Sequence, residues 1–320
     1  MPKGQEREGV LEVPPSSGPP RRTTFFRGEK GKKNMINNKK LYFILLFLFV
    51  LCLILLGIIF SSQKQELSVN FFDVGQGDAI LISQGNKQVL IDGGPNGQIL
   101  LEKLGEYIPF WDRNIEVMIA THPDQDHIDG LIDAMKAYGV SEIIDNSAQS
   151  DSQVYKKYRE TIEEKNIPRL KGQAGMNIKI SNEANLEILY PGENLENNPK
   201  DTNADSIVSK LSFGDNSFLL TGDLPDNKEQ ELADKNINLK SGVLKVSHHG
   251  SKYATTSEFL EKVMPDDAVI SAGKNNRYGH PSQEVLDRLN EKKINILRTD
   301  ERGDIKYICD NTGELCILDL

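Results

Sequence analysis

Two histidines and three aspartates lie within the segment ATHPDQDHIDG, residues 120–130, directly after the apolar run IEVMI. The whole chain contains only five histidines. The other three, His248, His249 and His280, also lie in short Gly-rich or polar segments, and functional side chains gather in loops of this kind at strand ends. We therefore interpret the five histidines as one functional set.

The first cluster has the composition of a metal site. The side chains of His122, Asp124, Asp126 and His127 leave the backbone within two turns, so they can converge on one point. Imidazole and carboxylate together suit Zn, Mn or Fe, and the two carboxylates admit harder ions as well. The alternative is structural, with Asp126 or Asp129 capping the helix that follows.

Three later segments extend this set. Asp223 ends the apolar run FLLTGD, where a carboxylate could bridge two metals about 3.5–4 Å apart. In SHHGSKY, an extended backbone would not let His248 and His249 reach the same metal, so one is expected as a ligand and the other as a substrate contact or proton carrier. His280 is expected at the start of a helix, where backbone N–H groups favour an anion.

Alternating short apolar runs and helical patterns must position these residues from Leu67 onward. We predict strands over residues 67–74, 78–83, 87–92, 115–120, 186–191, 206–213, 217–223, 242–247, 267–273 and 294–299, and two closing strands around DNTGE. Helices are predicted over residues 131–140, 155–167, 226–236, 257–264 and 281–293. Two β-rich halves with intervening helices favour an α/β (α+β) fold, a four-layer αββα sandwich with its sites along one edge.

Residues 41–60 form twenty consecutive residues without a charge, the length that spans a bilayer core of about 30 Å. A cleaved signal peptide is the alternative, although its apolar stretch is usually shorter. Ten Lys and Arg precede the run, so the positive-inside rule predicts a cytoplasmic N-terminus and an extracytoplasmic domain. Residues 1–40 are expected to form a disordered basic tail, within which Met35 could be an alternative start.

The part of the chain after residue 60 is acidic, with 28 Lys and Arg against 43 Asp and Glu. This charge argues against a broad nucleic-acid-coating surface, but a metal site supplies positive charge locally. We expect Lys245, Lys252, Lys274 and Arg277 to add to that local attraction.

The three cysteines do not form a metal motif. Cys52 lies in the apolar run. Cys309 and Cys316 flank a predicted turn and could pair in an oxidising compartment.

The ordered set FFDVGQGDAILI, IDGG, THPDQDHIDG, FLLTGD, SHHGSKY and YGHPS resembles the metallo-β-lactamase-like domain at the C-terminus of ComEC-type DNA-uptake channel proteins. The resemblance covers about residues 68–320. It implies an αββα fold, two divalent metal ions (Zn²⁺ or Mn²⁺), and hydrolysis of a phosphate ester by a metal-activated water. The channel region of that family is replaced here by a single anchor, which suggests a separate DNA-uptake channel as a partner.

The resemblance also implies roles for individual residues. His122 and Asp124 match the ligands of a first metal, Asp126 and His127 match those of a second, and Asp223 matches the bridge. His249, or alternatively His248, matches the second metal's downstream histidine. Asp92 matches a carboxylate that orients a ligand imidazole, whereas Asp73 and Asp78 are expected mainly to shape the adjacent loop.

Two departures from the superfamily pattern concern the first metal. Asp124 replaces a histidine, and no histidine occurs between His127 and His248. Asn203 and Asp205 occupy the approximate position of the missing ligand. We therefore expect a first site that binds metal more weakly and prefers harder ions.

These observations lead to the hypothesis of a membrane-anchored, extracytoplasmic hydrolase (domain residues 67–320) that cleaves phosphodiester bonds, with DNA as the leading substrate. Asp126 and Asp223 would hold and orient the attacking water, while His248, Lys252 and His280 would bind the substrate oxyanion or protonate the leaving oxygen. Two alternatives remain: a phosphoesterase for cell-surface polymers or small esters, and a non-catalytic binding module.

Overall fold

The computed structural model describes residues 38–62, 66–192 and 201–319. The chain divides into two units, residues 1–62 and residues 63–320. The described part of the first unit is one helix, α1 (Asn38–Ser62), whose residues 38–57 are long and apolar enough to cross a membrane. The predicted disordered tail falls largely on residues 1–37, which lie outside the described residues.

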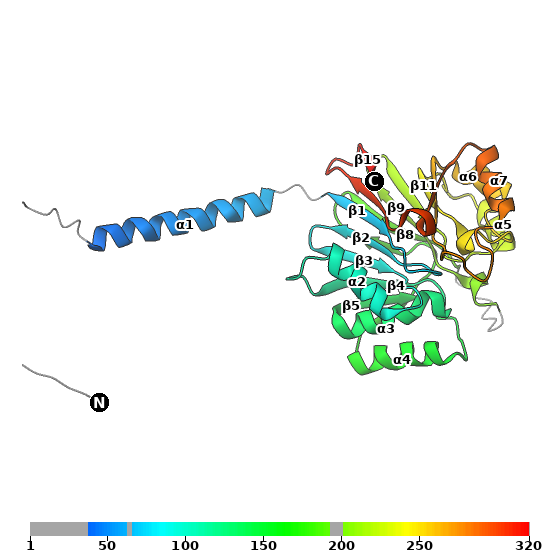
Figure 1. Ribbon diagram of the computed structural model, residues 1–320, viewed down its shortest axis with the longest axis horizontal. Helices are drawn as coiled ribbons and strands as arrows, with labels where there is room; N and C mark the ends of the chain where they lie inside the picture. The colour runs from blue at the N-terminus through cyan, green and yellow to red at the C-terminus, as the bar shows by residue number, and fades with distance from the viewer. Residues whose placement is uncertain (1–37, 63–65, 193–200, 320) are drawn as a thin grey trace, which may run out of the picture. The chain divides into compact units, whose positions relative to one another are not determined.

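The second unit contains two sheets (Figure 1). The strands of sheet A, in spatial order, are β15 (Cys316–Asp319), β14 (Ile305–Cys309), β1 (Leu67–Phe71), β2 (Ile80–Gln84), β3 (Lys87–Ile91), β4 (Asn114–Ala120), β5 (Gly139–Asp145) and β6 (Arg169–Lys171). Those of sheet B are β13 (Asn295–Arg298), β12 (Asp267–Ile270), β11 (Val243–Lys245), β10 (Asn216–Leu220), β9 (Val208–Phe213), β8 (Ala184–Tyr190) and β7 (Asn177–Lys179).

Three apolar cores join the sheets and helices into four layers. The central core lies between the sheets, where Val69 and Phe71 of β1 join Leu211 of β9 and Phe218 of β10. A second core lies under the helices of sheet A, which are α2 (Gly97–Tyr107), α3 (Gln125–Ala137) and α4 (Gln153–Lys165). A third lies under those of sheet B, which are α5 (Asp226–Asp234), α6 (Ser257–Val263) and α7 (Gln283–Glu291). The predicted αββα sandwich is confirmed.

The shorter elements lie in connections: the 3₁₀ turns η1 (Asn203–Asp205) and η2 (Ser247–Gly250), and the helix α8 (Thr299–Arg302). The sequence patterns did not predict α2, β5, β6 or β7, and the first residues of β5 were assigned to the end of a helix over 131–140. The helix begins earlier, at Gln125, with Asp124 as its N-terminal flanking residue, so the proposed caps Asp126 and Asp129 lie inside it. The Asp124 side chain makes no capping hydrogen bond to this helix.

Strand register defines two ends of the domain. Leu67 pairs with Gln84 of β2 and Cys309 of β14, while at the other end of the strand Phe71 pairs with Ile80 and Ile305. We call the Leu67 end the tether end, because the domain connects there to the rest of the chain. The opposite end, where β1, β3, β4, β10 and β11 finish, is called the site end.

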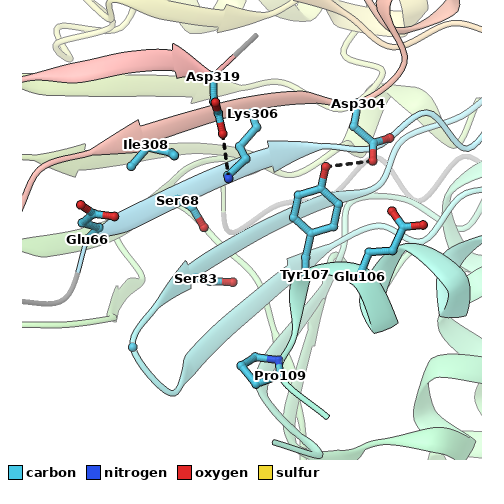
Figure 2. A pocket seen from close by; sticks show the side chains of 11 residues that line it. Glu66, Ser68, Ser83, Glu106, Tyr107, Pro109, Asp304, Lys306, Ile308 and Asp319 are labelled. Atoms are coloured by element: carbon cyan, nitrogen blue, oxygen red, sulfur yellow. Dashed lines mark hydrogen bonds and ion pairs between the residues drawn. The ribbon is translucent and has the colours of Figure 1, made fainter. Parts of the chain in front are cut away.

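A cavity of about 660 Å³ extends along β1 and β14 from Glu66 at the tether end to Asp304, beside the end of α2 (Figure 2). Four carboxylates line it, those of Glu66, Glu106, Asp304 and Asp319. Lys306 pairs with Asp319 at 2.9 Å. The Tyr107 hydroxyl donates a hydrogen bond to Asp304 at 3.0 Å, and this contact raises the pKa of Tyr107 further after burial has raised it.

Candidate metal centre

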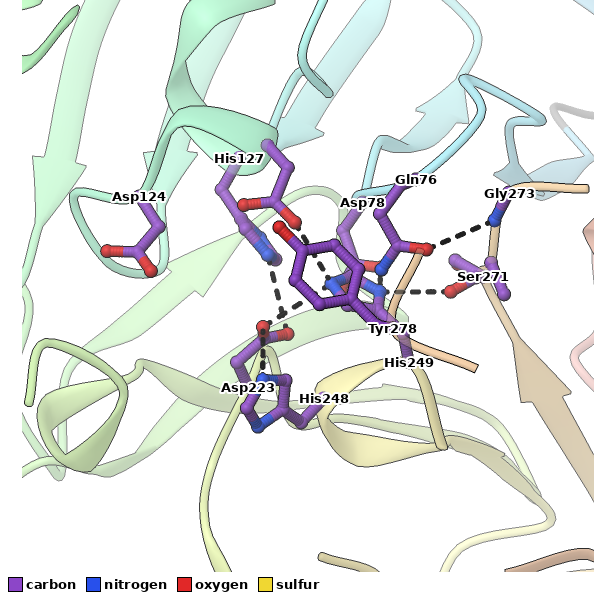
Figure 3. A network of polar contacts seen from close by, with 12 residues as sticks. Gln76, Asp78, Asp124, His127, Asp223, His248, His249, Ser271, Gly273 and Tyr278 are labelled. Atoms are coloured by element: carbon purple, nitrogen blue, oxygen red, sulfur yellow. Dashed lines mark hydrogen bonds and ion pairs between the residues drawn. The ribbon is translucent and has the colours of Figure 1, made fainter. Parts of the chain in front are cut away.

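The site end brings residues from three segments, those that follow β4, β10 and β11, to one point (Figure 3). His122 follows β4, and Asp126 and His127 lie in the first turn of α3. Asp223 follows β10, and His249 follows β11. Ligand atoms of His122, His127 and Asp223 lie within 4.8 Å of one another, as do those of Asp126, His127 and His249.

Asp223 lies at the centre of the cluster. One of its oxygens, Oδ1, is 3.4 Å from His127 Nε2, and the other, Oδ2, is 3.3 Å from His249 Nε2 and 4.0 Å from His122 Nε2. Asp126 Oδ2 approaches His249 Nε2 to 3.5 Å. A carboxylate whose two oxygens face different imidazoles has the arrangement required to bridge two ions.

Each of the three buried histidines has its Nδ1 against a hydrogen-bond acceptor. His127 Nδ1 lies 2.7 Å from Asp92 Oδ2, and His249 Nδ1 lies 2.9 Å from the Ser271 carbonyl oxygen. The Thr121 hydroxyl donates to Asp92 Oδ2 at 2.7 Å, so its oxygen is left to accept from His122 Nδ1 at 3.0 Å. In the neutral imidazoles the proton is therefore on Nδ1, and the Nε2 lone pair is free.

The Nε2 atoms of His122, His127 and His249 are buried and have no hydrogen-bond partner among the described residues, and the same is true of Asp223 Oδ1. Buried polar atoms without partners are costly, and in native sites they commonly mark a missing ion or water. Three imidazole lone pairs converging on a carboxylate are a suitable donor set for a divalent cation.

The electrostatics support this conclusion. Burial alone would raise the pKa of Asp223, but the neighbouring His249 and His127 hold it well below its ordinary value. Burial alone would lower the pKa of His127, but Asp223 and Asp92 raise it well above the ordinary histidine value. His249 behaves in the same way, because Asp223 and Asp78 outweigh its burial. The carboxylates therefore create a strong negative potential at the Nε2 atoms, which a divalent cation would neutralise.

Asp124 stands apart from this cluster (Figure 3). Its side chain is 41% exposed, and its Oδ2 lies 3.8 Å from His122 Nε2. It accepts a hydrogen bond from the Thr202 hydroxyl at 2.5 Å. Thr202 immediately precedes η1, so the segment NADSIV does lie beside the first predicted metal position, where Asn203 Oδ1 is buried without a partner in the described part of the chain.

The two adjacent histidines do not have the extended backbone assumed from the sequence. His248 and His249 both have left-handed φ values, 48° and 54°. Both rings consequently approach Asp223: His248 Nε2 lies 3.8 Å from Asp223 Oδ2. Only His249 is fully buried, whereas His248 is partly open to solvent.

His280 lies two residues before the cap of α7, next to His248 at a ring-centroid distance of 5.7 Å. Burial, and then the neighbouring His248, lower the pKa of His280 to about 4. At neutral pH the imidazole is therefore uncharged.

The loop after β1 packs against the cluster and contributes Asp78, which contacts His249. Asp78 is buried, 2.8 Å from Lys245 Nζ and 3.4 Å from His249 Nδ1. Burial would raise the pKa of Asp78, but Lys245 and His249 lower it to about 2. Asp73 lies farther out, where it accepts a hydrogen bond from Gly75 N–H.

Gly77 packs against the first turn of α3. A Cβ at this position would lie 2.1 Å from the Asp126 carbonyl oxygen, and its φ is +123°. The loop can approach Asp126 only because residue 77 is glycine.

One expectation about the basic residues was wrong. Lys245 is fully buried against Asp78, so it cannot attract substrate. The other cations lie on the rim of the site: Lys252 Nζ is 5.0 Å from the ring centre of Tyr253, and the Arg277 guanidinium is 4.8 Å from that of Tyr278. Lys274 is exposed.

A cavity of about 410 Å³ adjoins the cluster, lined by Gln76, Pro95, Gln125, Asp126, Asn276, Arg277 and Tyr278. It is smaller than the cavity along β1 and β14, but it includes Asp126 of the candidate metal centre. We therefore consider it the access route to the site.

Several contributing residues were not identified from the sequence. Thr121 links Asp92 to His122, and its position directly before the cluster was the only available signal. The Ser271 carbonyl oriented against His249 has no sequence signature, because any residue supplies a carbonyl.

Comparisons with known proteins agree with this architecture. Residues 72–274 match the family model of the metallo-beta-lactamase superfamily. The chain is 34% identical over 266 residues to ComE operon protein 3 of Bacillus subtilis, covering 78% of this chain and 34% of that protein. It is 29% identical over 248 residues to competence protein ComA of Neisseria gonorrhoeae, covering 76% of this chain and 32% of that protein.

The chain thus spans about a third of the length of these curated relatives. Among solved structures, the metallo-beta-lactamase fold protein YhfI from Bacillus subtilis is similar with a TM-score of 0.50 at 10% identity, covering 75% of this chain and 99% of that one. This last likeness concerns the fold alone. The family match extends over most of the αββα domain and includes the loops that carry His122, Asp126, His127, Asp223 and His249, and on this ground the chain belongs to the metallo-beta-lactamase superfamily.

Proposed function

We propose that the domain is a metal-dependent hydrolase of phosphodiester bonds that acts on DNA in the context of DNA uptake. The observation that carries this proposal is the convergence of three buried, unpartnered Nε2 atoms, those of His122, His127 and His249, around Asp223. The competence protein and the ComE operon protein among its relatives supply the link to DNA uptake.

His122, His127, Asp126, Asp223 and His249 would hold two divalent ions, with Asp124 as an outer ligand of the first. Such ions, when bound, lower the pKa of a coordinated water to about 7 and polarise a phosphoryl oxygen. Asp92 and Thr121 keep the ligand imidazoles in the required tautomer through their Nδ1 contacts.

The remaining side chains would handle the substrate. His248 is partly open to solvent and close to Asp223, so it is placed to transfer a proton to the leaving oxygen. His280, neutral at pH 7, would donate a hydrogen bond to the substrate oxyanion. Lys252 and Arg277 on the rim would contact backbone phosphates, and the exposed rings of Tyr253 and Tyr278 could stack on bases of a single strand.

We further propose residues 1–40 as a cytoplasmic tail, residues 41–60 as a single-pass anchor, and residues 67–320 as an extracytoplasmic domain. The basic residues before the apolar helix support this orientation. The Cys309–Cys316 disulfide also supports it, because disulfides persist in oxidising compartments. Protease added to intact cells should digest the domain, and full protection would contradict the orientation.

Purified full-length chain, assayed with Mn²⁺ or Zn²⁺, tests the activity. Single-stranded DNA and bis-p-nitrophenyl phosphate should both be hydrolysed, and Asp223→Ala should show neither activity. Hydrolysis of the small ester alone would favour a phosphoesterase for small or cell-surface esters, which the acidic surface supports. Hydrolysis of neither substrate by metal-loaded protein would identify a binding module.

A further inference from the structure

The tether end of the domain exposes large apolar side chains that the proposed reaction does not use. Phe110 is 79% and Trp111 72% exposed, the highest values among the large apolar residues described for the domain. Leu315 is 58% exposed. Exposed apolar groups gathered at one end of a domain indicate an interaction surface.

Phe110 and Trp111 lie in a turn that is defined by hydrogen bonds on its C-terminal side. They are the two central residues of a turn closed by the Asp112 N–H, which donates to the Pro109 carbonyl at 2.8 Å. The Asp112 carboxylate accepts hydrogen bonds from Gln88 Nε2 at 3.2 Å and from Asn114 N–H at 3.1 Å. The two rings meet edge to face at 4.9 Å and therefore form one apolar projection.

Sheet topology places this projection and Leu315 on either side of the chain's connection to α1. The turn precedes β4, Leu315 precedes β15, and β1 lies between these strands in sheet A. Cys309 and Cys316, which flank the Leu315 turn, belong to the same end of the sheet as Leu67. Glu66 and Pro109 also line one cavity (Figure 2).

The length of the connection limits how far this end can lie from a membrane. Only residues 63–65 separate Ser62, the last residue of α1, from Glu66. Four peptide steps span at most about 14 Å. If α1 crosses the bilayer, the tether end is kept close to the headgroup layer, where Trp and other aromatic rings partition favourably.

We propose that Phe110, Trp111 and Leu315 form a membrane-docking surface that inserts into the lipid interface and holds the site end facing away from the bilayer. The inference rests on the proposed single-pass anchor, but it is independent of the hydrolase activity and of the direction in which α1 crosses. Because carboxylates line the neighbouring cavity, docking depends on apolar insertion and needs no anionic lipid.

Trp111 is the only tryptophan in the chain, so its fluorescence reports on this surface alone. The full-length protein is reconstituted into zwitterionic phosphatidylcholine vesicles, with or without bromine on the acyl chains. We expect the brominated lipid to quench Trp111 strongly and aqueous iodide to quench it weakly. Phe110→Ser combined with Leu315→Ser should reverse this order without changing hydrolysis of a small ester.

A matched control variant combines Trp111→Phe with Tyr253→Trp, so that its one tryptophan lies at the site end. Its emission should be quenched by iodide and unaffected by brominated lipid. One result would overturn the docking surface and leave the anchor intact. In that result, alkaline carbonate does not release the chain from the vesicles, but iodide still quenches Trp111.

Two other results would also overturn the inference. Protection of Trp111 from iodide could instead increase with the protein-to-lipid ratio, without any quenching by brominated lipid. That result would identify a contact between protein copies. Release of the chain by carbonate would remove the anchor on which the tether argument depends.

Discussion

The two ends of the sandwich carry different kinds of exposed side chain. At the site end the exposed large side chains are Tyr253 and Tyr278, each against a cation. At the tether end they include Phe110, Trp111 and Leu315, and no cation lies over the ring of Phe110 or Trp111 in the described structure. The same two sheets therefore present a polar edge, which carries the candidate metal centre, and an edge with exposed apolar side chains, and strand direction keeps the two apart.

This comparison predicts that substitutions at the site end change chemistry more than stability, and that those at the tether end do the reverse. Strand ends in an α/β sandwich supply the physical reason: loops there can vary while the buried strand residues, such as Val69 and Phe218, hold the fold.

The largest effect is expected for Asp223→Ala. This substitution removes the carboxylate that faces His127 and His249, and it should lower turnover at least about 10³-fold. Circular dichroism should show an intact fold, and metal content should fall. Residual activity within tenfold of the parent would contradict the bridging role.

A second prediction concerns Glu229, which lies beneath the loop after η2 and accepts hydrogen bonds from Thr255 and Thr256 N–H. Burial raises the pKa of Glu229 to about 7 from an ordinary value of 4.5. The native state thus holds the proton more tightly than the unfolded chain, so stability should fall by on the order of 3 kcal/mol as the pH rises from 4.5 to 7, and this contribution should then level off.

Urea unfolding of the full-length protein at several pH values measures this dependence. Glu229→Gln should flatten the slope over that interval, since the amide does not titrate. An unchanged slope in the variant would assign the pH dependence to other groups.

Asp92→Asn sharpens the comparison within the site end, because Asp92 contacts a ligand imidazole without facing the proposed metals. Loss of its charge should weaken the hydrogen bonds that Asp92 accepts from His127 Nδ1 and from Thr121. Metal affinity should therefore fall about 10–100-fold. Isothermal titration with Mn²⁺ measures the change. Restoration of activity at high metal concentration would distinguish a positioning residue from a structural one, whose loss added metal would not repair.

At the tether end, Cys309→Ser combined with Cys316→Ser should lower stability without altering the site. The disulfide closes a short loop of seven residues' separation, for which chain entropy gives about 2 kcal/mol. Thermal unfolding should detect this loss, while metal content and turnover of a small ester should match the parent. A fall in metal content would show that the two ends are coupled.

Sequence patterns predicted most strands and the residues that converge, since buried strands and ligand loops have local signatures. His122, Asp126, His127, Asp223 and His249 could be identified because uncommon residue types stand in order after apolar runs. Features that depend on tertiary packing could not. Lys245 was taken for an exposed basic residue, but it lies buried in β11, a strand inside sheet B, and pairs with Asp78 from a loop distant in the sequence.

The local backbone conformation could not be predicted from the sequence either. The segment SHHGSKY contains no signal for a left-handed backbone conformation at two consecutive histidines. This conformation brings both imidazole rings toward Asp223. The helix α2 was not predicted either: the segment GGPN before it is typical of a loop, although Asn96 in fact caps the helix by accepting hydrogen bonds from the N–H groups of Gln98 and Ile99.

The last prediction concerns Asp124 and has the smallest expected effect, because this residue lies at the outer edge of the site and not at its centre. Its side chain is 41% exposed and shared with Thr202, whereas Asp126 and Asp223 face buried imidazoles. Asp124→Ala should therefore lower turnover only about 3–10-fold, a fraction of the loss in Asp223→Ala. In metal-depleted parent protein, Mn²⁺ should restore activity better than Zn²⁺, since an oxygen ligand beside His122 suits the harder ion, and Asp124→His should shift this preference toward Zn²⁺. Metal content and rates measured for both variants test the assignment: if Asp124→Ala matches the parent in both, Asp124 is a residue of the loop and takes no part in binding metal.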